Sequence, residues 1–93
     1  MSSFYPRLYA EFLRALREER ESAGITQREL AAKLQLMQSQ ISKCESGDRR
    51  LDPVELVFWL RALGTDPVAF LASLSDKMAS SSPVGAAKAS KSK

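Results

Sequence analysis

The close spacing of helix-ending and helix-starting signals constrains this chain more than any other feature. Glycine ends a helix well because it adopts the left-handed conformation just past the last turn at little cost. Such glycines occur at Gly24, Gly47 and Gly64. A residue that favours a helix N-cap follows each of them within a few positions, namely Thr26, Asp52 and Asp66. Helices this short are unstable alone, so the sequence predicts a bundle in which each helix packs on the others.

The signals divide the chain into five expected helices. The first runs from about Pro6 to Gly24, the second follows Thr26, and the third covers about Gln38–Cys44. The last two open with Asp-Pro-Val at 52–54 and 66–68, where Asp caps and Pro takes the first helical position. Helical spacing predicts these inward residues in chain order: Leu8, Phe12, Leu13, Leu16, Arg20, Leu30, Ala31, Leu34, Ile41, Cys44, Leu56, Trp59, Leu60, Leu63, Val68, Leu71, Leu74 and Met78, with Phe70 beside the last group. The fold class expected is all-α, a compact five-helix bundle.

Length and composition set the domain organisation. With 93 residues the chain has room for one domain, which we assign to residues 1–78. Residues 79–93 are rich in Ala, Ser and Lys and contain no acidic or aromatic residue. Such a segment buries too little apolar surface to offset the entropy of ordering. We therefore expect a disordered tail that keeps the protein in solution, with nonspecific, salt-sensitive affinity for DNA as the alternative role of its lysines.

Several function classes are disfavoured by the composition. The chain has no His and one Cys, so the common zinc ligand sets and the commonest general base are absent. We expect no cofactor, no metal and no enzymatic activity. No run of about 18 apolar residues predicts a membrane span, and the first residues lack the basic start and apolar stretch of a signal peptide. The expected location is the cytoplasm.

The charge distribution matters more than the net charge of +3. The 11 acidic residues all lie before Ala79 and are balanced there by 11 of the basic ones. The surplus therefore lies in the tail. Within the balanced part, cations outnumber anions between Gln27 and Arg50, and anions outnumber cations from Leu51 to Met78. Nucleic acid, if bound, is expected at the middle of the chain.

Two short helices in that middle region suggest a helix-turn-helix. The first carries a capping box, Thr26-Gln27-Arg28-Glu29, and the connection to the next covers only about residues 35–37. The small Ala31 allows the two helices to cross closely. The outward face of the second of them is polar and free of acid, which suits a helix in a DNA major groove. We expect base contacts from Gln38, Ser39, Ser42 and Lys43. The loop arginines that follow, Arg49 and Arg50, are placed for phosphate or minor-groove contact.

The sequence resembles the lambda-repressor and Cro-like family, the XRE-type helix-turn-helix regulators. The resemblance covers roughly residues 13–74. It rests on Arg20 four residues before Gly24, Thr26-Gln27, Leu30-Ala31, Leu34, Gln38-Ser39, Ile41-Ser42, Glu45, Gly47 and Leu63-Gly64. It implies a five-helix domain that binds palindromic operators as a dimer, with contacts from Gln27 and Arg28 to the DNA backbone and an ion pair between Arg20 and Glu45.

Two positions depart from the family pattern. Gln35 stands where the family commonly has Gly in the turn, which predicts a strained backbone or an altered turn. Met37 stands where Ser or Thr often caps the recognition helix, and the missing cap is expected to cost about 1 kcal/mol.

The remaining apolar residues suggest a partner surface. Helix four has one face for its own core, so leftover large side chains are candidates for a dimer interface: Val57, Phe58, Phe70, Leu74 and Met78. We expect a transcriptional regulator, a repressor or autoregulator. An antitoxin with the same fold would use such a surface or the tail to bind a toxin, and a module that binds only protein is a third hypothesis. Cys44 is expected to be a small buried side chain, with redox sensing as the alternative.

Overall fold

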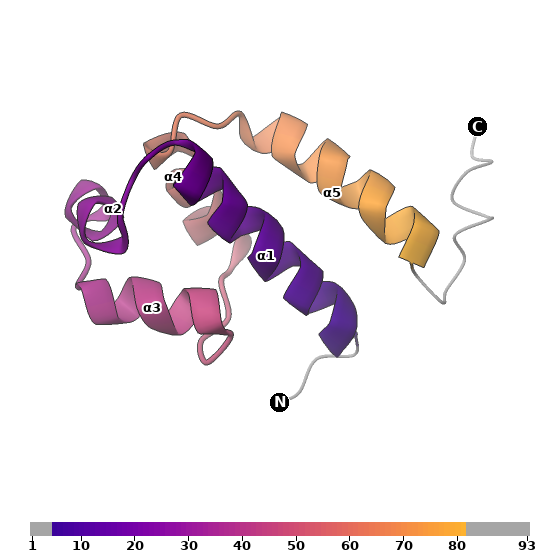
Figure 1. Cartoon of the computed structure of the whole chain (residues 1–93), viewed down its shortest axis with the longest axis horizontal. Coiled ribbons are helices and arrows are strands. Elements are labelled where there is room, and N and C mark those ends of the chain that lie inside the picture. The colour runs from indigo at the N-terminus through magenta and orange to yellow at the C-terminus, as the bar shows by residue number, and fades with distance from the viewer. Residues whose placement is uncertain (1–4, 82–93) are drawn as a thin grey trace.

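The structure, a computed structural model, describes residues 5–81, which form five helices and no strand. Their bounds are α1 Pro6–Ser22, α2 Gln27–Leu34, α3 Gln38–Ser46, α4 Pro53–Ala62 and α5 Pro67–Ser81. Helix α1 crosses the middle of the molecule, with α2 and α3 at one end and α5 along its other side (Figure 1). Helix α2 packs on α3 and α4, α1 packs on α3 and α5, and α4 packs on α5. The predicted all-α bundle is confirmed.

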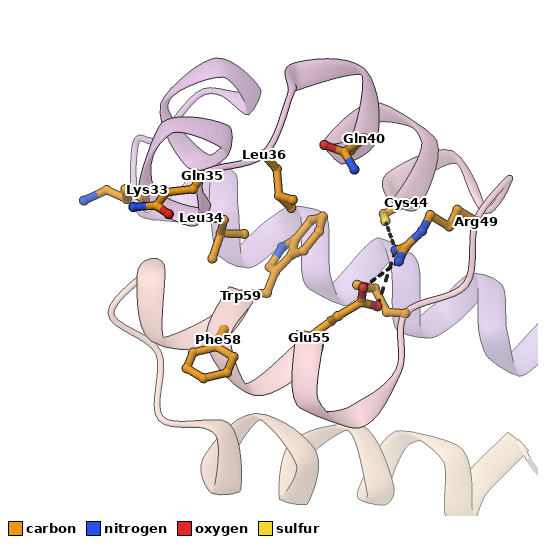
Figure 2. A pocket seen from close by; sticks show the side chains of 11 residues that line it. Lys33, Leu34, Gln35, Leu36, Gln40, Cys44, Arg49, Glu55, Phe58 and Trp59 are labelled. Carbon is orange, nitrogen blue, oxygen red and sulfur yellow. Dashed lines mark hydrogen bonds and ion pairs between the residues drawn. The ribbon is translucent and has the colours of Figure 1, made fainter.

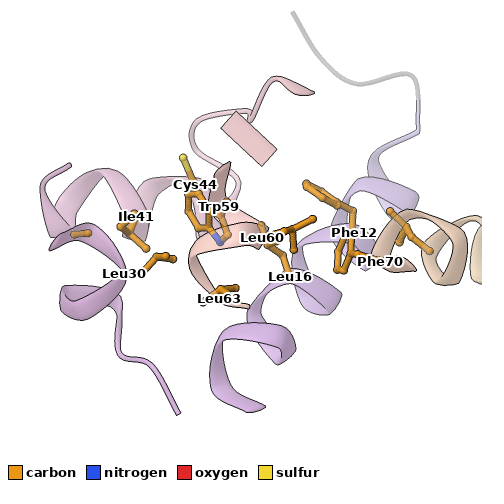
Figure 3. Close-up of a cluster of buried hydrophobic side chains, with 11 residues drawn as sticks. Phe12, Leu16, Leu30, Ile41, Cys44, Trp59, Leu60, Leu63 and Phe70 are labelled. Carbon is orange, nitrogen blue, oxygen red and sulfur yellow. The ribbon is translucent and has the colours of Figure 1, made fainter. Parts of the chain in front are cut away.

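One hydrophobic core joins all five helices (Figure 3). Helix α1 directs Leu8, Phe12 and Leu16 inward at a spacing of four residues, and the same stripe ends on the buried Arg20. The largest fully buried side chain is Trp59 of α4. The other helices contribute the apolar residues Leu30, Ala31, Ile41, Cys44, Leu60, Leu63, Phe70 and Leu74. Helices this short depend on such shared burial for their stability.

Side-chain caps fix where two of the helices start. Thr26 Oγ1 accepts from the backbone N–H of Glu29 at 3.0 Å, and Glu29 Oε1 accepts from that of Thr26 at 2.9 Å. Asp52 and Glu55 make the same reciprocal pair at 2.8 and 3.0 Å. These capping boxes satisfy amide groups that a helix start leaves without an intrahelical partner. They place the first turns of α2 and α4 where the sequence predicts them.

Helix α5 faces the core differently from the prediction. The predicted inward side included Val68 and Leu71, yet Val68 is 75% exposed and Leu71 is also exposed. The buried residues are Phe70 and Leu74. The reason lies in α1: the ring of Phe12 meets that of Phe70 edge to face, with centroids 6.3 Å apart. Packing against α1 therefore selects the neighbouring stripe of α5 and leaves Val68 and Leu71 at the surface.

The far end of α5 bears on the predicted domain boundary. The helix continues to Ser81, beyond Ala79 where we expected the tail to begin. The rest of the predicted tail, residues 82–93, lies outside the described residues, as do residues 1–4. Within residues 5–81 no single helix is long and apolar enough to cross a membrane. Helices α4 and α5 reach that length and composition only as a pair bent by 113°.

Candidate nucleic-acid interface

The turn between α2 and α3 contains the one strained residue expected from the sequence. Gln35 has φ +59° and ψ +42°, the left-handed conformation, and is the one non-glycine residue with positive φ in residues 5–81. Its neighbour Leu36 donates its backbone N–H to the carbonyl of Ala31 at 2.9 Å, which closes the end of α2. A left-handed L-residue costs roughly 1–2 kcal/mol. The turn therefore keeps its tight geometry with Gln35 in the place of a glycine.

The start of α3 is capped by its third residue and not by its first. Met37 has no side-chain acceptor for the helix amides, as expected. The Gln40 side chain supplies half of a capping box, because its Oε1 accepts from the backbone N–H of Met37 at 2.8 Å. We did not predict this role for Gln40. A Gln three residues after a helix N-cap is a recognisable signal for it.

Helix α3 divides sharply into two faces. Ile41 and Cys44 are fully buried against the core. The opposite side is solvent-exposed and carries all four residues predicted to read bases: Gln38, Ser39, Ser42 and Lys43. Their offsets of one, four and five positions from Gln38 place them together on one side of a helix. The exposed face holds amide, hydroxyl and ammonium groups and no carboxylate, so it can offer both donors and acceptors to an anionic partner.

A chain of side-chain hydrogen bonds links that face to the core. Arg20 of α1 pairs with Glu45 of α3 through two bonds, Nε to Oε2 at 2.7 Å and Nη2 to Oε1 at 3.0 Å. Gln27 donates from Nε2 to Glu45 Oε1 at 2.9 Å. Gln38 in turn donates from Nε2 to Gln27 Oε1 at 3.4 Å. The ion pair implied by the family resemblance is therefore present, and it continues through Gln27 to the first residue of α3.

Glu45 is charged despite its burial. The side chains of Arg20 and Glu45 are only 9% and 3% exposed. Burial by itself would raise the pKa of Glu45, but the hydrogen bonds from Arg20 and Gln27 and the positive charge of Arg20 outweigh it, so the pKa is lowered. The same pairing raises the pKa of Arg20. Arg20 and Glu45 are both ionised at neutral pH, and each neutralises the charge of the other.

The N-terminus of α2 forms a shallow hollow beside Gln38 that is lined by polar and charged residues. Its lining includes Thr26, Gln27, Arg28 and the Arg20 side chain. Arg28 is exposed and makes no ion pair within residues 5–81, and the same is true of Lys43 on α3. A helix N-terminus carries partial positive charge and attracts anions. The hollow is thus electrostatically suited to a phosphate group.

The two loop arginines make contacts that the sequence did not reveal. Arg49 forms an ion pair with Glu55 of α4 and donates from Nη1 to Cys44 Sγ at 3.3 Å. The bonds with Glu55 raise the pKa of Arg49 and lower the pKa of Glu55. Arg50 lies over the ring of Tyr9, with Cζ 3.9 Å from the ring centroid. The charge of Arg49 is therefore balanced inside the protein, whereas Arg50 keeps a charge that no carboxylate in the described chain neutralises.

A family model described as helix-turn-helix matches residues 16–70. A solved structure, an XRE-family like protein from Pseudomonas syringae pv. tomato str. DC3000, is 45% identical, with a TM-score of 0.76 over 78% of this chain and 89% of that one. No curated protein sequence matches the chain. The chain belongs to the XRE-type helix-turn-helix family. Members of this family are DNA-binding transcriptional regulators.

The XRE-type domain uses part of the predicted dimer surface for its own core. Phe70 and Leu74, which we expected at an interface, are buried within the monomer because α5 turns this stripe toward α1. Val57 and Met78 are half-buried, and Met78 packs on the core. Only Phe58 of the five is freely exposed, at 58%. The exposed large apolar residues of α4 and α5 are instead Val54, Phe58, Val68 and Leu71.

The single cysteine of this XRE-type chain is a buried core residue. Cys44 is almost fully buried, in keeping with the packing role expected for it. Within residues 5–81 no cluster of Cys, Asp or Glu is arranged to hold a metal ion.

Proposed function

We propose that this protein is a sequence-specific repressor or autoregulator that places α3 in the major groove of DNA. The observation that carries the proposal is the exposed, acid-free face of α3, which begins at Gln38. A Gln amide can pair with both N6 and N7 of adenine, and Ser39, Ser42 and Lys43 lie on the same face. The hydrogen bond from Gln38 to Gln27, at 3.4 Å, favours one orientation of the Gln38 side chain before DNA arrives, so less rotamer freedom is lost on binding.

Backbone contacts would come from the neighbouring helix start. Gln27 and Arg28 border the hollow at the N-terminus of α2, where the helix dipole and an unpaired guanidinium both favour a phosphate. Arg50 adds an exposed cation after α3, and Arg49 contributes less because Glu55 balances it. Contacts of this kind set the position of a protein on the duplex and make its affinity dependent on salt.

A dimer would supply the specificity that one short helix lacks. A single α3 reads only a few base pairs, whereas two copies about 34 Å apart reach successive major grooves on one side of the DNA. The surface we propose for the two-fold contact consists of Val54 and Phe58 on α4 with Val68 and Leu71 on α5. These replace the core residues Phe70 and Leu74 of the sequence-based prediction. A bound dimer would repress by occupying a palindromic operator in the cytoplasm, without enzymatic activity.

Selection from a random pool of double-stranded DNA tests the proposal. Wild-type protein should enrich a palindrome with half-sites about one helical turn apart. Gln38→Ala should lose preference at one position of each half-site. Glu18→Gln, a matched change on the exposed side of α1, should enrich the wild-type sequence. Failure to enrich any sequence, at a salt concentration that permits nonspecific binding, would refute the proposed function.

An antitoxin role is the second candidate. The observation that favours it is the exposed apolar surface of α4 and α5, which a toxin could cover as well as a second copy of the chain. Co-expression with the product of an adjacent gene separates the two roles. A stable complex that buries Phe58 in a heteromer, and is lost in Phe58→Glu, would support the antitoxin; a homodimer unchanged by that product would oppose it.

A further inference from the structure

A second site lies behind the helix-turn-helix, between α2, α3 and α4 (Figure 2). It is a cavity of about 310 Å³ with mainly apolar walls. Leu34 and Leu36 from the end of α2 and the turn form one wall, and Trp59 and Phe58 of α4 form another. Natural small-molecule pockets begin at about 300 Å³. The cavity is therefore large enough for a compound of one or two rings, and it is separate from the exposed face of α3.

The polar groups around this cavity are mostly hydrogen-bond donors. The indole nitrogen of Trp59 is buried and has no hydrogen-bond partner in the described part of the chain. Gln40 uses its amide oxygen to cap Met37, so its amide nitrogen remains for the cavity, the side to which it points in Figure 2. The Arg49 guanidinium also lines the cavity, whereas the Lys33 side chain points away from it in Figure 2. The carboxylate of Glu55 is already engaged by Arg49 and by the backbone N–H of Asp52.

We infer that this cavity binds a small planar aromatic carboxylate. The ring would lie against Leu34, Phe58 and Trp59, and the carboxylate oxygens would accept hydrogen bonds from the donors that the protein leaves unused. A buried N–H without an acceptor is unfavourable, so a ligand that supplies one gains affinity there. An aromatic amine of the same size should bind more weakly, because it brings a further donor to groups that already lack an acceptor.

The side chain of Leu36 connects the cavity to the turn that precedes α3. Trp59 is only 1% exposed and its indole nitrogen is buried, so a ligand would reach that nitrogen only after a neighbouring side chain moves. Leu36 is 40% exposed and points toward the indole in Figure 2. Displacing Leu36 would disturb the turn that carries Gln35 and sets the start of α3. Binding is therefore expected to change DNA affinity; this regulatory part rests on the proposed function, whereas binding itself does not.

The sole tryptophan provides a direct binding assay. Its indole N–H gives one unambiguous signal in a ¹H–¹⁵N spectrum, and full-length protein is titrated with benzoate and with 1-naphthoate in the absence of DNA. We expect a saturable shift of that signal with a dissociation constant below about 1 mM for 1-naphthoate. The matched control, 1-naphthylmethylamine, should bind at least tenfold more weakly. No saturable indole shift from either acid, or equal binding of the amine, would overturn the site.

Two variants and one DNA measurement complete the test. Calorimetry with Trp59→Phe, which keeps a ring but lacks the N–H, should show at least fivefold weaker binding of 1-naphthoate; unchanged binding would overturn the role of the indole nitrogen. Lys33→Gln changes an exposed side chain that points away from the cavity, so this matched control should bind 1-naphthoate as wild type does. Operator affinity should change at least threefold with 1-naphthoate present. If 1-naphthoate shifts the indole signal but leaves operator affinity unchanged, the regulatory effect is refuted and the binding site is not. If the protein binds no operator at all, the proposed function is refuted, and the titration without DNA still decides whether the site exists.

Discussion

Arg20 and Glu45 lie 25 positions apart in the chain and form a two-bond ion pair that is almost completely buried. A buried pair contributes little relative to two apolar residues, but removing one partner leaves an unpaired charge in a low-dielectric site. Here the pair also fastens α1 to the end of α3. The stability of the domain and the placement of α3 therefore depend on the same contact.

We predict that Arg20→Ala lowers the free energy of unfolding by about 3 kcal/mol. The cause is the stranded carboxylate of Glu45, together with the lost bond from Arg20 to the carbonyl of Ile25. Urea denaturation followed by circular dichroism measures the change. Arg17→Ala is the control, because Arg17 pairs with Glu21 on the exposed surface and such pairs contribute less than about 1 kcal/mol. Equal losses in the two variants would contradict the prediction.

The pair should also give stability a defined pH dependence. The pKa of Glu45 is lower in the folded protein than in the unfolded chain. Its ionised form therefore stabilises the fold above the unfolded value, about 4.3, and this contribution is lost as the pH falls through the folded value. The stability difference between wild type and Glu45→Gln should be largest near neutrality and shrink in acid. Denaturation curves from pH 7 down to pH 3 provide the test, and a constant difference would argue against it.

Gln35→Gly should stabilise the domain by about 1 kcal/mol. Gln35 is left-handed, and glycine adopts that conformation without the steric cost that an L side chain incurs. Gln35→Ala keeps a Cβ and should leave stability close to that of wild type. Thermal unfolding of the three proteins distinguishes the backbone effect from loss of the Gln side chain. If Ala stabilised as much as Gly, strain would not be the cause.

The base-reading and backbone contacts should respond differently to salt and sequence. Gln38→Ala is expected to weaken operator binding by about 1–3 kcal/mol and to leave binding to scrambled DNA nearly unchanged. Arg28→Ala should weaken binding to operator and to scrambled DNA alike. It should also reduce the slope of log affinity against log salt concentration by about one. Fluorescence anisotropy at several salt concentrations separates the two. A Gln38→Ala loss of the same size on scrambled DNA would exclude base reading.

Phe58→Glu should weaken self-association and operator binding together, without unfolding the protein. The side chain is exposed in the monomer, so a charge there is harmless until the proposed two-fold interface forms. Sedimentation equilibrium with and without a palindromic operator measures the effect. Ala10→Glu adds the same charge at an exposed position of α1 and should behave as wild type. A saturated complex of one monomer per full operator would refute the dimer.

The helix boundaries were predictable because local chemistry decides them. Capping boxes at Thr26 and Asp52 and glycines after the last turns act within a few residues, and the structure places the helices accordingly. The strained conformation of Gln35 was predictable for the same reason. Each of these signals is read from neighbouring residues along the chain.

The facing of α5 was not predictable, since it depends on a distant helix. Two stripes of α5 have helical spacing: one contains positions 68, 71, 74 and 78, and the other contains positions 70, 74 and 78. The contact between Phe12 and Phe70 decides which stripe is buried. The stacking of Arg50 on Tyr9 is also a long-range contact, and the pairing of Arg49 with Glu55, six positions along the chain, depends on how the loop turns into α4. The sequence shows a basic loop there, but it does not show which side chains neutralise or cover it.

The division of α3 into a buried and an exposed face has a consequence for evolution. Substitutions at Ser39, Ser42 or Lys43 touch no core residue, so a lineage can drift toward a new operator at these positions without a folding penalty. Gln38 is different, because its partner Gln27 is itself bonded to Glu45. A new residue at 38 removes the hydrogen bond to Gln27, so these two positions should diverge together when such regulators acquire new targets.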